Sequence, residues 1–259
     1  DFLFAGDLLN QCISAGYAAR SAGVPFFGLY GACSTMAESL GLAAMLLDGG
    51  FGEWGAAVTS SHFCSAERQY RTPLEYGGQR TPTSQWTATA AGAVVLAKNG
   101  DGPYITHVTP GRIRDKGIKD ANNMGAAMAW AAYDTISQHL KDTKRSSSFY
   151  DLIVTGDLGK LGMEIVIDLF AADGIELRGN YNDCGIMLFD LEGQDVHCGA
   201  SGCGCAASVL TGYLLNGMRE GKWHNLLFCA TGALHSPTSL GQGESIPGIC
   251  HAVAISTQK

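Results

Sequence analysis

Short, almost uninterrupted apolar runs recur along this chain, separated by longer segments that suit helices. Strands that are apolar throughout, instead of alternating between apolar and polar residues, are expected when helices cover both faces of a sheet. The repeated order of strand, helix and strand is typical of α/β proteins. We therefore expect an α/β fold with helices at about residues 34–47, 121–140 and 206–218.

The second half of the chain repeats the pattern of the first half in the same order. Each half has an apolar strand ending in Gly-Asp-Leu, a glycine turn that opens a helix, a strand that ends in histidine, and a closing strand. The matching segments are 1–8 with 151–158, 31–47 with 202–215, 52–62 with 221–235, and 91–96 with 250–255. We expect two pseudo-symmetric α/β halves, residues 1–145 and 146–259, with a loop at 73–82 and a serine-rich link at 146–148. The alternative is two unrelated α/β units whose glycines coincide.

Composition restricts the classes of function. With 259 residues, 46% of them hydrophobic, the chain can bury a large core and is not disordered. A formal net charge of −7 offers no basic surface to nucleic acid. Nine cysteines, most in apolar or glycine-rich runs, are expected to be reduced thiols in a reducing compartment. No apolar stretch reaches the roughly 18 residues that span a bilayer, so a membrane role would be peripheral.

Cys33 is the candidate nucleophile. It follows an apolar strand at 26–30 and a Gly-Ala turn, and it precedes Ser34 and Thr35, where a helix would begin. The free amide groups of a helix N-terminus stabilise a thiolate and lower the pKa of a cysteine. The same amides could hold a ligand carboxylate. The alternative is that Cys33 packs inertly in the core.

Residues 31–40, Gly-Ala-Cys-Ser-Thr-Met-Ala-Glu-Ser-Leu, are similar to the nucleophile motif of thiolases and β-ketoacyl synthases. Over essentially the whole chain, the sequence resembles the stage V sporulation protein AD family of the thiolase-like superfamily. The segments that carry this resemblance are Gly-Asp-Leu-Leu-Asn-Gln at 6–11, Ala-Glu-Arg-Gln at 66–69, Glu-Tyr-Gly-Gly-Gln at 75–79, Asn-Asp-Cys-Gly at 182–185, Ser-Gly-Cys at 201–203 and Glu-Ser-Ile-Pro at 244–247. The resemblance implies a thiolase-like fold, with two α/β halves in a layered α-β-α-β-α arrangement. It also implies that the family's first strand and helix are missing before Asp1.

A thiolase-type condensation needs a thiolate, an activating histidine and donors for the carbonyl oxyanion. Thiolases carry Gly-His-Pro before a Gly-Ala-Ser-Gly stretch, and here Val196 stands where that histidine should be, with His197 displaced by one residue. Ser245 stands where a second cysteine is expected, and a hydroxyl is a poor substitute as proton donor and acceptor. The resemblance therefore favours a protein without turnover. The alternative is an active acyltransferase or condensing enzyme that uses Cys33, with His197 or His235 as base.

By resemblance, the ligand is dipicolinic acid, or its calcium chelate, taken up into the developing spore. Two helix N-termini, near Cys33 and near Cys203, would offer amide donors to such a dianion, while apolar walls hold its ring. The guanidinium of Arg68 could pair with a carboxylate. A purely architectural subunit is disfavoured because polar residues gather in glycine-rich turns. The candidate ligand-binding residues are Cys33, Ser34, Asp7, Asn10, His62, Arg68, Asp183, Ser201, Cys203, His235 and Ser245.

Two further groups of side chains leave alternatives open. His62 and His235 each follow a buried strand, and each could line a pocket or satisfy a loop carbonyl. Asp7, Glu67 and Asp183 could contact calcium, but we favour a role in tying down loops. We expect no resident metal and no cofactor beyond calcium carried with the ligand. The resemblance also implies a peripheral protein on the spore's inner membrane, partners encoded in the same operon, a homodimer, and no nucleic acid.

Overall fold

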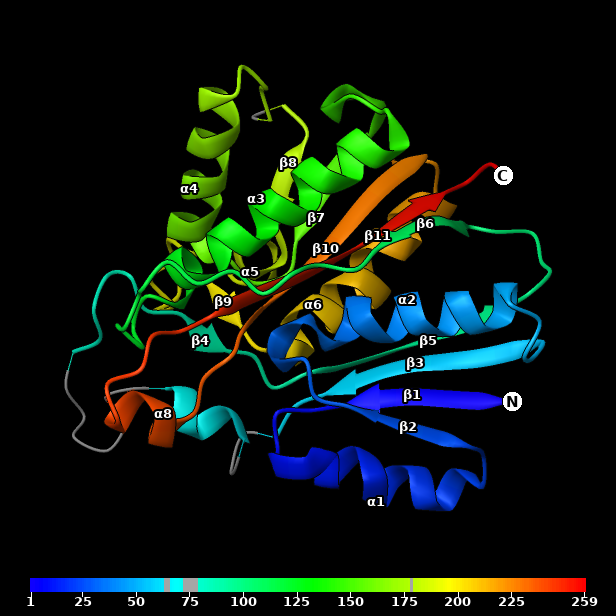
Figure 1. Cartoon of the computed structure of the whole chain (residues 1–259), viewed down its shortest axis with the longest axis horizontal. Coiled ribbons are helices and arrows are strands. Elements are labelled where there is room, and N and C mark those ends of the chain that lie inside the picture. The colour runs from blue at the N-terminus through cyan, green and yellow to red at the C-terminus, as the bar shows by residue number, and fades with distance from the viewer. Residues whose placement is uncertain (63–65, 72–78, 178) are drawn as a thin grey trace.

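Two β-sheets form the framework of the chain (Figure 1). The computed structural model describes residues 1–62, 66–71, 79–177 and 179–259, so most of the loop expected at 73–82, and the motif at 75–79 except its last residue, lie outside the described residues. The first sheet has the order β2 (Phe26–Leu29), β1 (Phe2–Gly6), β3 (Trp54–Ser60) and β5 (Ala91–Ala97). The second has the order β6 (Tyr104–Thr109), β11 (Gly248–Ser256), β10 (Asn225–Ala233), β7 (Leu152–Thr155) and β8 (Tyr181–Asp183). A short third pair joins β4 (Trp86–Thr87) to β9 (Ala200–Ser201).

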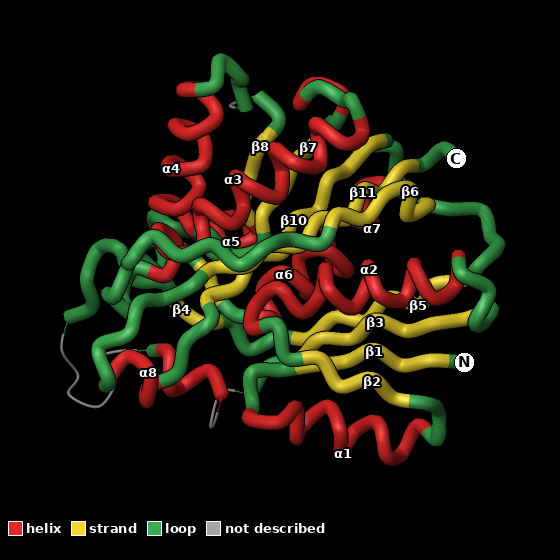
Figure 2. Tube along the Cα trace, viewed as in Figure 1, coloured by secondary structure: helices red, strands yellow, loops and turns green. Residues whose placement is uncertain are grey.

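Helices fill the space between the sheets and cover their outer faces. They are α1 (Ile13–Ala22), α2 (Thr35–Asp48), α3 (Met124–Thr143), α4 (Gly159–Ala172), α5 (Cys184–Leu188), α6 (Cys203–Val209), α7 (Leu215–Arg219) and α8 (Pro237–Gly241). Helix α2 contacts strands of both sheets, while α3 packs on β10 and β11 from the other side. Figures 1 and 2 show the resulting layers, from α1 through the first sheet, the central α2 and α6, and the second sheet to α3 and α4.

The three expected helices are present. Helix α2 begins one residue after the expected start, and α3 runs from 124 to 143 instead of 121 to 140. The Asn123 side chain caps α3 by accepting the backbone N–H of Ala126 at 3.4 Å. The third helix is α6 and α7, joined by a π-helical turn at Leu210–Leu214. Apolar periodicity cannot distinguish such a turn from a continuous α-helix, since both bury one side.

The two sheets share one strand order. β2, β1, β3 and β5 correspond to β8, β7, β10 and β11, and in both sheets the last of these runs antiparallel to its neighbour. Strand β6 pairs with β11, and α3 packs on the second sheet. Residues 104–145 therefore lie with the second sheet, and the serines at 146–148 form a short turn between α3 and β7. Turn composition marks a break in the chain but does not reveal which strands pair across it.

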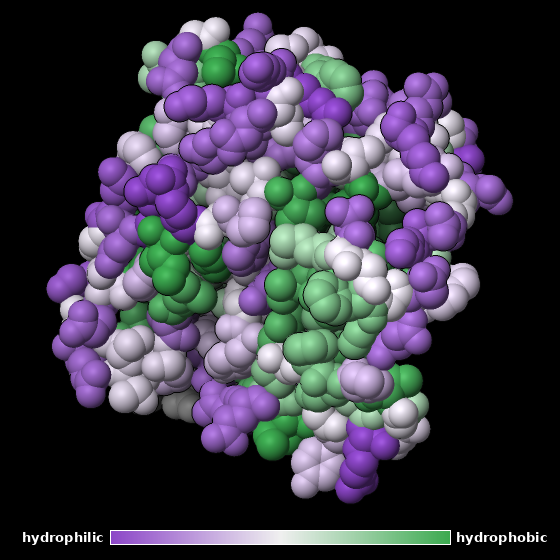
Figure 3. Space-filling model, turned by 45° about the vertical axis from the view of Figure 1, so that its right-hand side comes forward, coloured by the Kyte–Doolittle hydropathy of each residue, from purple (hydrophilic) through white to green (hydrophobic). Residues whose placement is uncertain are grey.

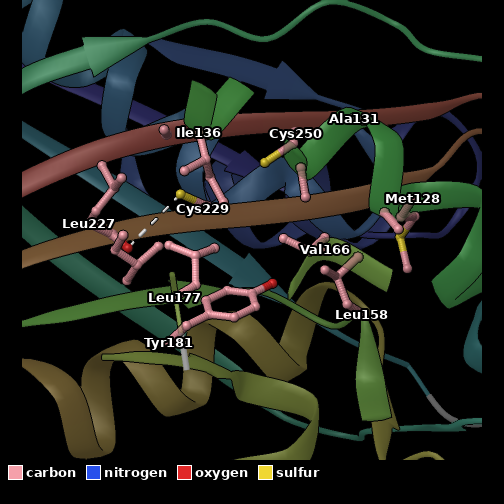
Figure 4. Close-up of a cluster of buried hydrophobic side chains, with 14 of the residues drawn as sticks. Met128, Ala131, Ile136, Leu158, Val166, Leu177, Tyr181, Leu227, Cys229 and Cys250 are labelled. Atoms are coloured by element: carbon pink, nitrogen blue, oxygen red, sulfur yellow. Dashed lines mark hydrogen bonds between the residues drawn. The ribbon is translucent and has the colours of Figure 1, made fainter. Parts of the chain in front are cut away.

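The buried core explains why the strands do not alternate between apolar and polar residues. Between the second sheet and the helices α3 and α4, a cluster of fully buried side chains includes Met128, Ile136 and Val166, shown in Figure 4. A second cluster fills the middle layer and includes Met36 and Phe228. Strands such as β7 and β10 contribute to both clusters, so both of their faces are buried. The eight cysteines among the described residues are buried, unpaired thiols.

The surface has one large groove, lined by residues of α2, β5, β6 and α7 and by the C-terminal residues of the chain, with a volume of about 920 Å³. In the view of Figure 3, apolar surface crosses the middle of the molecule, over the layer that holds α2. The groove follows the edge of β5, whereas β6 covers the corresponding edge of β11. Among the described residues, no helix is long and apolar enough to cross a membrane.

Candidate functional site

Cys33 lies in a tight turn between β2 and α2. The turn is a single 3-10 segment, Ala32–Ser34, and Ala32 adopts a left-handed backbone with φ of 52°. A non-glycine residue in this region costs about 1 kcal/mol or more, so the surrounding structure must hold the turn in place. Strand β10 passes directly beside it, since a Cβ atom on Gly232 would lie 2.8 Å from the carbonyl oxygen of Gly31. The strained turn, and the close approach of β10 at Gly232, which has no side chain, together fix the direction of the Cys33 side chain.

The matching turn of the second half meets this one. Gly202, with φ of 103°, precedes α6, and the Cys203 thiol donates to the carbonyl oxygen of Ser60 at 3.1 Å. Cys33 and Cys203 belong to one buried cluster, with Leu8 and Ala66. The expectation that the two helix starts lie together is confirmed.

The Gly202 amide at this junction is not free for a ligand. Asp157, fully buried just after β7, accepts the Gly202 N–H at 3.0 Å and the Ser201 hydroxyl at 3.1 Å through Oδ2. Its Oδ1 accepts the Thr231 hydroxyl at 2.8 Å. The Cys33 thiol interacts with the same carboxylate. The expected anion site at the start of α6 is therefore filled by a carboxylate of the protein itself.

This arrangement also reverses the expected acidity of the thiol. Burial raises the pKa of Cys33 well above 9, and the neighbouring Asp157 and Cys203 raise it further. The helix N-terminus was expected to lower this pKa, but desolvation and a nearby negative charge outweigh it. Cys33 is therefore a neutral thiol near pH 7, which is a poor nucleophile.

The acidic residues of the motifs tie loops together. Asp183, at the end of β8, accepts a hydrogen bond from the Thr155 hydroxyl at 2.7 Å. It also accepts the backbone amides of Leu158, Gly159 and Gly185 at 2.8–2.9 Å. Burial raises the pKa of its carboxyl group to about 7. Asp7 accepts the amides of two residues that follow it in the chain, at 2.7 and 2.8 Å. These bonds support the loop role over calcium binding. Among the described residues, no three His, Cys, Asp or Glu side chains are grouped as metal ligands.

Glu67 has the same kind of role. Its carboxylate is fully buried and accepts the backbone N–H of His62 at 2.7 Å. The residue that follows it, Arg68, is exposed, while Arg71 is buried and donates to Thr87 Oγ1 at 2.6 Å. The buried guanidinium in this region is therefore Arg71, three residues beyond the one that the sequence suggested.

A small pocket opens beside Cys33. It is lined by Leu8, Ala32, Cys33, Tyr70, Thr87, Met124, Ser201, Ala233 and His235. Its free volume is about 10 Å³, which is room for about one water molecule. The rings of Tyr70 and His235 meet edge to face with their centroids 5.1 Å apart. His235 Nε2 lies 3.3 Å from the Met124 sulfur, while Nδ1 is buried and has no hydrogen-bond partner among the described residues. Burial lowers the pKa of His235, so the imidazole is neutral at pH 7.

Three of the candidate residues line this pocket: Cys33, Ser201 and His235. Ser34 and Cys203 are buried directly behind it, with the Ser34 hydroxyl donating to the Gly31 carbonyl at 2.6 Å. The other candidates do not line it, and they are Asp7, Asn10, His62, Arg68, Asp183 and Ser245.

Some of these assignments are corrected by specific contacts. Asn10 is exposed and accepts the Tyr30 hydroxyl at 3.2 Å. Ser245 bonds to Asp115 at 2.5 Å, so it does not stand in for a second catalytic cysteine. His197 has a left-handed backbone and lies 3.3 Å from Asp195, away from the pocket lining.

Sequence reasoning missed Tyr70, Thr87, Met124 and Asp157. For Asp157 a signal existed, because the Gly-Asp-Leu repeat pairs it with Asp7, which was recognised. The other three lie on segments whose approach to Cys33 depends on tertiary packing, and they carry no local motif.

The sequence matches one protein family over almost its whole length. A family model described as Stage V sporulation protein AD matches residues 1–256. The stage V sporulation protein AD of Bacillus subtilis (strain 168) is 47% identical over 253 residues, which are 98% of this chain and 75% of that protein.

Solved condensing enzymes share the fold at much lower identity. OleA of Xanthomonas campestris bound to cerulenin has a TM-score of 0.63 and 14% identity, over 98% of this chain and 74% of that one. The 3-oxoacyl-(acyl carrier protein) synthase III of Pseudomonas aeruginosa PAO1 has a TM-score of 0.59 and 15% identity, over 98% and 75%. The enzyme of the same name from Aquifex aeolicus VF5 has a TM-score of 0.58 and 11% identity, over 99% and 77%. At these identities the likeness shows the thiolase-like fold and not the activity.

Proposed function

Because this chain belongs to the stage V sporulation protein AD family, we propose that it binds dipicolinic acid, free or as its calcium chelate, in the Cys33 pocket. In this proposal it serves uptake of the ligand into the developing spore and does not turn the ligand over. The observation that carries the proposal is a pocket lined by Cys33, Ser201 and His235 in which burial, with a smaller effect of Asp157, raises the pKa of the thiol. A thiol that keeps its proton suits binding better than acyl transfer.

The lining of the pocket suits a flat ring with polar ends. Tyr70 and Met124 offer an aromatic edge and a polarisable thioether to a pyridine ring. Nδ1 of His235, which has no hydrogen-bond partner among the described residues, offers a hydrogen bond to a carboxylate oxygen. The hydroxyls of Ser201 and Thr87 already donate within the protein, to Asp157 and to the Glu67 carbonyl. A mostly apolar pocket with a few convergent polar groups is the usual form of a small-molecule site.

Entry of the ligand requires movement. The free volume of about 10 Å³ is far smaller than a pyridine ring with two carboxylates. The rings of Tyr70 and His235 close one side of the pocket. The Tyr70 hydroxyl donates to the His235 carbonyl oxygen at 3.4 Å, which is a long and weak hydrogen bond. Turning these two rings apart is the simplest way to open the site, since it breaks no strong hydrogen bond between them.

The second candidate function is a condensing enzyme. It is favoured by one observation, that His235 lines the same pocket as Cys33, so an imidazole is close to the thiol. Against it, Asp157 and burial keep the thiol protonated, and Ser245 lies elsewhere. Acyl transfer therefore requires the thiol to lose its proton as well as the pocket to open, whereas binding requires only the opening.

The cellular setting belongs to the same proposal. Family membership supports a role in the spore. We propose a peripheral position on the inner membrane of the spore, contacts with proteins of the same operon, and a homodimer. Calcium would enter as part of the ligand, with no resident metal.

Calorimetric titration of the purified protein with dipicolinate, with and without calcium, tests the proposal. Saturable binding is expected to weaken in His235→Ala, which lines the pocket, and to persist in Asn10→Ala, which does not. Absence of binding in every form of the ligand would refute the proposal. Incubation with labelled acyl-CoA distinguishes the second candidate, because a stable thioester on Cys33 that is then transferred would establish turnover.

A further inference from the structure

We propose that Arg71 makes the Cys33 pocket select anionic ligands, because its guanidinium is hydrogen bonded to Thr87, a residue of the pocket wall. This inference rests on the proposed function and deepens it, since it names the residue that makes the site prefer a dianion to a neutral ring of the same shape. Arg71 does not line the pocket itself, so it acts through Thr87 as a positioning residue.

The part of the wall that holds Thr87 is the short pair of strands β4 and β9. Thr87 lies opposite Ser201 in this pair, and both residues line the pocket. The backbone N–H of Ala88 donates to the Ser201 carbonyl oxygen at 2.8 Å. Backbone hydrogen bonds therefore hold this part of the wall in place, and a charge attached to Thr87 keeps a fixed position relative to the pocket.

Arg71 is attached to Thr87 by two donors. Its Nε donates to Thr87 Oγ1 at 2.6 Å, and its Nη2 donates to the Thr87 carbonyl oxygen. The guanidinium lies over the ring of Trp86, 4.3 Å from the ring centroid. Arg80 lies over the same ring but pairs with Asp195 at 2.8 Å. Because Arg71 is only 5% exposed, water screens its charge less than it would at the surface.

The Thr87 hydroxyl can transmit this charge to a ligand. Its oxygen accepts the Nε hydrogen of Arg71, and its own hydrogen is donated to the Glu67 carbonyl oxygen at 3.3 Å. That second hydrogen bond is long, so turning the hydroxyl toward a ligand carboxylate would cost little. A hydroxyl that accepts from a charged donor is also a stronger donor, because linked hydrogen bonds polarise one another.

A dianion in this pocket needs a nearby cation. Asp157 is fully buried and accepts the hydroxyl of Ser201 at 3.1 Å, so an acid is already bonded to another residue of the lining. Burial lowers the pKa of His235, so the imidazole in the lining is neutral at pH 7. In the described part of the chain, no other Lys or Arg side chain is hydrogen bonded to a lining residue. Arg71 is therefore the cation placed to offset the charge of the ligand.

Calorimetric titration with two probes of the same shape tests the proposal. One probe is dipicolinate, and the other is its diamide, in which neutral amides replace both carboxylates. The parent protein should bind dipicolinate at least about tenfold more tightly than the diamide. Arg71→Gln should weaken dipicolinate binding by about tenfold to a hundredfold and should change diamide binding by less than about threefold. A merely structural role of Arg71 would weaken the binding of both probes alike.

Arg68→Gln is the matched control, because Arg68 begins the adjacent 3-10 segment, is exposed and does not line the pocket. It should leave the affinity for each probe unchanged. Thr87→Val keeps the shape of the wall and removes the hydroxyl that joins Arg71 to the ligand. It should therefore weaken dipicolinate binding more than diamide binding, and it tests the proposal even if Arg71→Gln does not fold.

Three results would overturn the proposal while leaving the binding function intact. They are equal affinities of the parent protein for the two probes, equal weakening of both probes in Arg71→Gln, and unchanged dipicolinate affinity in Arg71→Gln or Thr87→Val. Absence of dipicolinate binding by the parent protein is a different outcome, because it would refute the binding function and this inference with it.

Discussion

His139 allows a quantitative test of the core on the outer side of the second sheet. Its side chain is fully buried on α3, with Nδ1 at 2.8 Å from Thr109 Oγ1 and Nε2 at 2.5 Å from the Tyr150 hydroxyl. Arg145 donates to the same Tyr150 hydroxyl at 3.1 Å. Burial, with a smaller contribution from His107 and Arg145, lowers the pKa of His139 to about 4. The folded protein therefore keeps this imidazole neutral.

The sign of the pH effect follows from proton binding. The unfolded chain binds a proton at His139 near pH 6.5, while the folded protein does so only near pH 4. Stability from this residue is therefore complete above pH 6.5 and is lost as the pH falls toward 4. Between pH 7 and pH 4.5 the two pKa values correspond to a loss of about 2 kcal/mol in the free energy of unfolding.

The perturbation is His139→Gln, which removes the titrating group and keeps a polar side chain. Urea unfolding at pH 7 and pH 4.5 measures the free energy of unfolding of both proteins. The variant should be less stable at pH 7, because Thr109 or Tyr150 loses a partner. Relative to the parent, it should gain about 2 kcal/mol between pH 7 and pH 4.5.

The exposed His224 offers the control. His224→Gln should leave the pH dependence of the parent protein unchanged. A deficit in His139→Gln that is the same at both pH values would refute the argument, because it would show that His139 titrates alike in the folded and unfolded chains.

Three further results are expected. Asp183→Asn should gain about 2 kcal/mol or more relative to the parent between pH 5 and pH 8, since the folded pKa of about 7 makes the parent lose stability as the pH rises; a constant difference in urea unfolding would contradict this. Gly232→Ala should cost about 1–3 kcal/mol, because its Cβ would lie 2.8 Å from the Gly31 carbonyl oxygen, and an unchanged urea midpoint would show that β10 can move aside. Cys33→Ala should weaken dipicolinate binding less than about tenfold in calorimetry, as one sulfur contact is lost; an unchanged affinity would place the ligand elsewhere.

The arrangement of acids around Cys33 has a consequence for the ligand. In the proposed complex, Asp157 already accepts the Gly202 amide at the start of α6 and the Ser201 hydroxyl, so a bound dicarboxylate must rely on other donors, such as Nδ1 of His235. Hydrogen bonds of this kind each contribute about 0.5–1.5 kcal/mol. Affinity would then depend more on enclosure of the ring by Tyr70 than on the helix dipoles.

Much of this protein follows from the sequence alone. Apolar runs predict the strands, and the glycine turn before Ser34 predicts the start of α2, because both are set by neighbours in the chain. The repeat of Gly-Asp-Leu and of the helix starts predicts two similar sheets. The resemblance to a family identifies the fold.

Tertiary structure alone decided the rest. Pairing of β6 with β11 placed residues 104–109 on the second sheet, and packing of β10 and α6 against the Cys33 turn placed the thiol near Asp157. A helix start by itself predicts an acidic cysteine, but burial and an adjacent carboxylate reversed that prediction. Desolvation and charge act through space, between residues more than a hundred positions apart in the chain, and so no local pattern carries them.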